Sequence, residues 1–117
     1  MKGIYTLELN ALKDCEIKVG SLGSINFKKG KYYYVGSSQT NIEKRIERHK
    51  RKDKLIHWHI DYLTTNPCFK FLKAKKFINC SKSKECELAK KYVKNYSSIK
   101  GFGCTDCKCS SHLFYKN

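Results

Sequence analysis

The sequence predicts an α+β fold, of the broad α/β class: a small three-stranded, mostly antiparallel sheet flanked by helices. Two observations support it. Short runs of alternating apolar and polar residues, separated by glycines, fill the first third of the chain, as is typical of half-buried strands. Two later segments repeat apolar residues three and four positions apart, which is helical spacing. At 117 residues without an evident linker, the chain is most simply a single domain over residues 1–117.

Three runs are expected to form the sheet. Residues 3–9 alternate, residues 31–36 are dense in tyrosine, and residues 69–78 interleave lysine with apolar residues, all patterns that suit strands. Residues 16–19 and 24–27 are shorter candidates, with glycines between and after them. They predict an added hairpin between the first two sheet strands.

The helices are expected at residues 40–51 and 82–96. Thr40 and Glu43 have capping-box spacing, and Ile42 and Ile46 lie four apart on the face that turns inward. Residues 55–63 fit either a strand or a helix, and the length of the segment favours a helix. Residues 101–115 are rich in glycine and cysteine and are expected to form a loop.

The charge of the chain points to a polyanionic partner. Net charge is +15, from 25 basic and 10 acidic residues, which is typical of nucleic-acid binding, although codon bias also produces lysine-rich chains. All but three of the basic residues are lysine, so backbone contacts are expected rather than base reading. No apolar stretch is long enough for a membrane span or a signal peptide. We therefore expect a cytoplasmic protein.

Two tyrosine-glycine triplets and one basic helix form the principal motif set. Gly3-Ile4-Tyr5 opens the first strand, and Tyr34-Val35-Gly36 closes a later one. Arg45 and His49 follow, four residues apart, so both can face one site. A phenol, a guanidinium and an imidazole together suit work on a phosphodiester.

This motif set resembles the GIY-YIG nuclease superfamily. The resemblance covers the first half of the chain and extends loosely to residues 82–96. Two further segments are similar to a small prokaryotic branch of that superfamily: His-Trp-His-Ile-Asp at residues 57–61, and Phe-Gly-x-x-Asp-Cys-x-Cys-x-x-His at residues 102–112, followed by Leu-Phe. The chain departs from the superfamily in the long segment 6–33 between the triplets, and it has Ser37 where some members have lysine. The asparagine that often closes the motif set has no clear match.

The resemblance implies hydrolysis of a phosphodiester with one divalent ion, Mg²⁺ or Mn²⁺, held by a glutamate on a later helix. Glu85 is the expected ligand, because it shares the apolar stripe of its helix, whereas Glu87 shares its face with lysines. The remaining roles follow the motif order. The catalytic residues would be Tyr5, Tyr34, Arg45 and His49, with either tyrosine as the base, and Lys44, Arg48 and Arg51 would contact DNA.

The expected function is therefore a structure- or damage-directed DNA endonuclease, active in repair or recombination and with a possible repair-protein partner. The alternative is a non-catalytic nucleic-acid-binding domain on the same scaffold. Both would bind DNA with strong salt dependence. Cleavage, rather than binding, distinguishes them.

Two further polar groups have open interpretations. Cys104, Cys107, Cys109 and His112 offer ligand types that suit zinc, but their spacing is unusual, and we favour packed or redox-active thiols. In residues 57–61, a helix would align His57 with Asp61, whereas a strand would align His59 with Asp61. We expect structural hydrogen bonding from this group ahead of a role at the rim of the active site.

Overall fold

A computed structural model describes residues 2–79, 82–103 and 111–116. Its main sheet has five strands in the order β5-β1-β4-β7-β6, with every neighbouring pair antiparallel. The strands are β1 (Gly3–Ala11), β4 (Gly30–Ser38), β5 (Phe69–Ile78), β6 (Ser97–Ser98) and β7 (Leu113–Lys116). The mostly antiparallel α+β fold is confirmed. The prediction of three strands is wrong, because β6 and β7 are too short to show a period and form only by pairing with β4 and with each other.

The hairpin expected between β1 and β4 is present as a separate two-stranded sheet. β2 (Cys15–Lys18) pairs antiparallel with β3 (Ser24–Phe27). A short 3-10 turn, Gly20–Leu22, joins them, and Gly20 and Gly23 take positive φ values of 47° and 78° there. These are values that glycine tolerates best.

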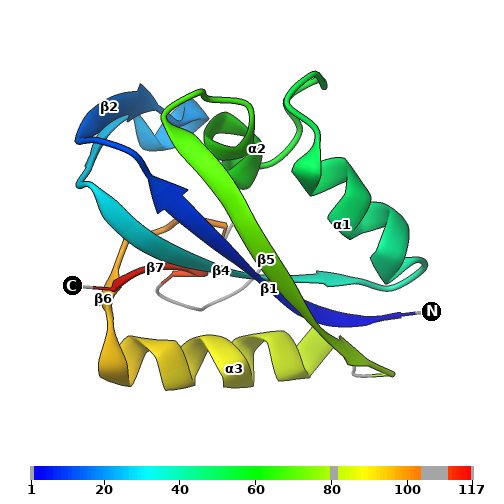
Figure 1. The fold of residues 1–117 in the computed structure, drawn as a ribbon. Helices are drawn as coiled ribbons and strands as arrows, with labels where there is room; N and C mark the ends of the chain where they lie inside the picture. The colour runs from blue at the N-terminus through cyan, green and yellow to red at the C-terminus, as the bar shows by residue number, and fades with distance from the viewer. Residues whose placement is uncertain (1, 80–81, 104–110, 117) are drawn as a thin grey trace.

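Helices cover both faces of the sheet (Figure 1). α1 (Ile42–Lys50) and α2 (His59–Thr64) lie on one face, and α3 (Lys82–Asn95) runs across the other. The larger core cluster joins alternate β1 residues such as Leu7 to Ile42 of α1 and Ile60 of α2. A smaller cluster packs Ala89 of α3 against the sheet. Within the described residues, no helix is long and apolar enough to cross a membrane.

The observed boundaries of the helices and of β7 correct three details of the sequence prediction. α1 begins at Ile42, since Asn41 rather than Thr40 is its N-cap and accepts a hydrogen bond from the Lys44 amide at 3.0 Å. Residues 55–58 are not helical, because the Asp61 carboxylate binds the amides of two of them and α2 starts only at His59. The expected loop at 101–115 includes the start of β7.

Candidate active site

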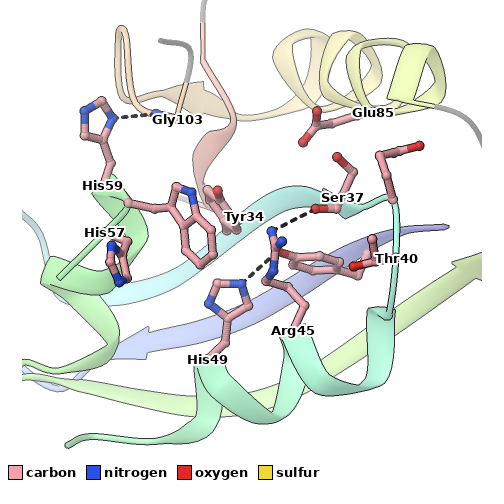
Figure 2. Close-up of a pocket in the computed structure, with 12 residues that line it drawn as sticks. Tyr34, Ser37, Thr40, Arg45, His49, His57, His59, Glu85 and Gly103 are labelled. Atoms are coloured by element: carbon pink, nitrogen blue, oxygen red, sulfur yellow. Dashed lines mark hydrogen bonds between the residues drawn. The ribbon is translucent and has the colours of Figure 1, made fainter. Parts of the chain in front are cut away.

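One pocket of about 420 Å³ gathers most of the residues that the motifs single out. Its lining comes from β1, β4, α1, α2 and α3 and from the segments between them (Figure 2). The lining residues are Tyr5, Tyr34, Ser37, Gln39, Thr40, Arg45, His49, His57, Trp58, His59, Glu85 and Gly103. All four expected catalytic residues and the expected metal ligand are among them.

The pocket lies beside the end of β4. Within the described residues, β7 pairs with β4 over residues 31–34, and the Val35 amide then donates to the His112 carbonyl. Side chains from both faces of the sheet meet at this end of the strand. Figure 2 shows Glu85 arriving from α3 on one side and Arg45 and His49 from α1 on the other.

Tyr5 is held between a glycine and a histidine. It lies opposite Gly36 in the β1–β4 register, and a Cβ placed on Gly36 would approach the Tyr5 ring and hydroxyl to 2.6 Å. The hydroxyl lies 2.7 Å from Nε2 of His49, and Tyr5 is almost fully buried. The glycine of the second triplet therefore makes room for the tyrosine of the first.

His49 is a buried and neutral imidazole. Burial, together with the positive charge of Lys54, lowers its pKa to about 3. Lys54 donates to the carbonyls of Arg48 and His49 at the end of α1, which fixes that charge nearby. Among the described residues the buried His49 Nδ1 atom has no hydrogen-bond partner, whereas Nε2 contacts the Tyr5 hydroxyl.

Both tyrosines are neutral phenols near pH 7. Burial raises the pKa of Tyr5 above its ordinary value, although the neighbouring Arg45 guanidinium acts in the opposite direction. Burial also raises the pKa of Tyr34, whose ring centroid lies 6.2 Å from that of His49. The Tyr5 hydroxyl is oriented within the pocket by its hydrogen bond to Nε2 of His49.

Arg45 reaches the pocket from the middle of α1. One of its terminal nitrogens donates to the Ser37 carbonyl at 3.2 Å, and its guanidinium carbon lies 4.4 Å from the centroid of the Trp58 ring. Arg48, one turn later, instead makes two 2.9 Å hydrogen bonds to Asp61. The two arginines therefore have different environments: Asp61 neutralises Arg48, whereas Arg45 faces the pocket.

Glu85 has the orientation that helical periodicity predicts. It is buried in the first turn of α3 and lines the pocket, whereas Glu87 is exposed and pairs with Lys84 at 3.1 Å. Nδ1 of His112 lies 3.7 Å from the Glu85 carboxylate. A carboxylate at a polar pocket suits a hard cation such as Mg²⁺, which commonly keeps several waters. The described residues contain no group of three or more side chains that could form an all-protein metal cage.

In the 57–61 segment, Asp61 has a structural role, whereas the two histidines line the pocket. Asp61 is fully buried and accepts from the amides of His57 and Trp58 at 2.8 and 3.0 Å, which agrees with structural hydrogen bonding. His57 and His59 line the pocket, and Nδ1 of His59 accepts from the Gly103 amide at 2.8 Å. Trp58 also lines the pocket, but no periodic pattern marks it, because its ring packs against side chains from α1.

The expected DNA contacts lie along α1. Lys44 and Arg51 are exposed, and with Arg48 they line a second, shallower hollow that also includes Glu43 and Glu47. Arg48 is half-buried and committed to Asp61. Lys44 and Arg51 therefore remain the more accessible cations of this set.

Of the expected cysteine-histidine group, only His112 belongs to the described part of the chain. Cys104, Cys107 and Cys109 lie outside the described residues. His112 is buried, and its Nδ1 lies near the Glu85 carboxylate.

A family model described as "Domain of unknown function DUF123" matches residues 4–117. The match spans nearly the whole chain, which therefore belongs to this family. No curated protein and no solved structure matches the chain.

Proposed function

We propose that this DUF123 member is a divalent-metal-dependent endonuclease that hydrolyses DNA phosphodiester bonds, and that it is related to the GIY-YIG nucleases. One observation carries the proposal: Tyr5, Tyr34, Arg45, His49 and Glu85, which are far apart in the chain, line one pocket. A net charge of +15 supplies attraction for the nucleic-acid backbone. With its cations mostly lysine, the protein would select DNA structure or damage, alone or with a repair partner, rather than sequence.

Each residue has a role that its surroundings permit. Arg45 would contact the scissile phosphate and stabilise the charge that develops on it. Tyr5 is the better-placed residue to position the attacking water, because its hydroxyl is oriented by the hydrogen bond to Nε2 of the neutral His49 and its oxygen can still accept from water. Tyr34 would order the attacking water beside them.

Glu85 would hold the metal ion, with water completing the coordination. A bound Mg²⁺ or Mn²⁺ supplies Lewis-acid stabilisation of the phosphate and lowers the pKa of coordinated water. The buried carboxylate and its polar surroundings fit such an ion. His112, next to Glu85, would help to orient that carboxylate.

The test is cleavage of nicked, branched and flapped DNA by purified protein with Mg²⁺ or Mn²⁺. Arg45→Ala and Glu85→Gln should each lower the rate by roughly 100-fold or more, and chelation of the metal should abolish cleavage. Glu87→Gln is the matched control, because Glu87 lies on the same helix but on its exposed face. Cleavage that survives both site substitutions would refute the site. DNA binding without any cleavage would identify a non-catalytic binding domain instead.

A further inference from the structure

The His-Trp-His-Ile-Asp segment, residues 57–61, contains a second set of contacts that ends on the proposed catalytic arginine. It begins at Asp61, whose carboxylate is completely buried. Burial alone would raise the pKa of Asp61, but hydrogen bonds from Arg48 and from the backbone amides of His57 and Trp58 bring it below its ordinary value. Asp61 is therefore a fixed anion, with Arg48 and two amides held in defined positions.

Trp58 is the next member of this set. Its backbone amide donates to Asp61. Two guanidinium groups lie over its ring, with the guanidinium carbon of Arg48 at 4.5 Å and that of Arg45 at 4.4 Å from the ring centroid. Both distances lie well within the range of cation–π attraction. The Arg48 guanidinium is itself fixed by Asp61, so the indole is oriented both through its backbone and through a cation over its ring.

The type of contact matters for Arg45. A guanidinium stacks on an aromatic ring through its face, which leaves the N–H donors at its edge free for a phosphate. A carboxylate partner, such as Asp61 for Arg48, occupies those donors instead. An indole can therefore orient an arginine without competing for the substrate.

We propose that Trp58 is a positioning residue that orients the Arg45 guanidinium for phosphate, and that Asp61 and Arg48 hold Trp58 in place. This inference rests on the proposed function only in naming phosphate as the group that Arg45 contacts. The stacking of Trp58 on Arg45 can be tested in the protein alone.

The first experiment needs no catalysis. Trp58 is the only tryptophan of the chain, so its ring current and its fluorescence report on this contact. In NMR spectra, the side-chain protons of Arg45 should be shifted upfield in the wild type and should return toward ordinary values in Trp58→Ala, but much less in Trp58→Phe. Arg45→Ala should alter the tryptophan emission. Arg45 resonances that do not move in Trp58→Ala would overturn the inference, whether or not the protein cleaves DNA.

The second experiment separates positioning from folding. Trp58→Ala should lower kcat for DNA cleavage about 10-fold with little change in KM, which corresponds to about 1.4 kcal/mol of transition-state stabilisation, and Trp58→Phe should restore most of the rate. Leu55→Ala is the control, because that side chain is 79% exposed and its removal leaves the carbonyl that accepts from Arg48. Wild-type kcat in Trp58→Ala would also overturn the inference. A wild type that never cleaves would refute the proposed function and leave the NMR result to decide the role of Trp58.

Discussion

Gly36 can be tested as the residue that makes room for Tyr5. Gly36 is absent from the positive-φ glycines of the described chain, so alanine meets no backbone obstacle there. Within an unobstructed strand, alanine in place of glycine would stabilise the fold by roughly 0.5–1 kcal/mol. Here the new Cβ would come within 2.6 Å of the Tyr5 ring, and overpacking of a buried site costs about 1–3 kcal/mol. Whether Gly36→Ala raises or lowers the free energy of unfolding therefore shows whether residue 36 contacts the Tyr5 ring.

The assay is a double-mutant cycle by urea denaturation. Gly36→Ala should destabilise the wild type, but it should be neutral or stabilising in Tyr5→Leu, whose shorter side chain leaves the space open. The two effects should differ by roughly 1–3 kcal/mol, the overpacking cost alone, because the gain from replacing glycine is common to both backgrounds. In Tyr5→Phe the ring remains, so Gly36→Ala should still destabilise. An equal effect of Gly36→Ala in all three backgrounds would show that Tyr5 does not determine the need for glycine.

Three further predictions concern titratable groups. Arg48→Ala leaves the buried Asp61 carboxylate without its bidentate partner, so urea denaturation should show a loss of about 3 kcal/mol; wild-type stability would contradict that pairing. The pKa of His49 is about 3 in the folded protein and about 6.5 in an unfolded chain, so between these values the unfolded state binds more protons. Its contribution to stability is complete above about pH 6.5 and falls as pH is lowered, by roughly 1.4 kcal/mol per pH unit. The free energy of unfolding, measured from pH 7 to 4, should lose this pH dependence in His49→Gln but keep it in the control His57→Gln, which changes an exposed residue. The same pH dependence in both variants would refute the role of His49. Burial and the neighbouring Cys68 thiol raise the pKa of Cys15 to about 12, so iodoacetamide at pH 8 should alkylate Cys15 roughly 100-fold more slowly in the folded protein than in urea, as peptide mass spectrometry can measure; similar rates would exclude the shift.

The sequence predicted the parts of the fold whose signals are local. Alternation placed β1 and β5, and helical spacing placed α1 and α3 to within a few residues. The same spacing separated the buried Glu85 from the exposed Glu87. In each case the period of the element itself decides which side chains turn inward.

The missed features depend on partners far along the chain. β7 has four residues and is a strand because β4 offers it an edge. The start of α2 depends on the Asp61 carboxylate, which binds amides that a longer helix would have placed elsewhere. Trp58 becomes part of the pocket only through the α1 arginines. None of these has a periodic signature, since each is a tertiary contact.

The pairing of β7 with β4 also has a consequence for the order in which the chain is made. Tyr34 lies opposite Leu113, and Glu85 lies near His112, so the surroundings of both depend on residues that are synthesised later than they are. Contacts between such distant segments form late in folding, because the intervening chain must first be ordered. A growing polypeptide, or a fragment from interrupted translation, carries Tyr5 and Arg45 before Glu85 and Gly103, which also line the pocket, have been made. Synthesis of the β7 segment thus sets the earliest moment at which the strand paired with Tyr34 can form.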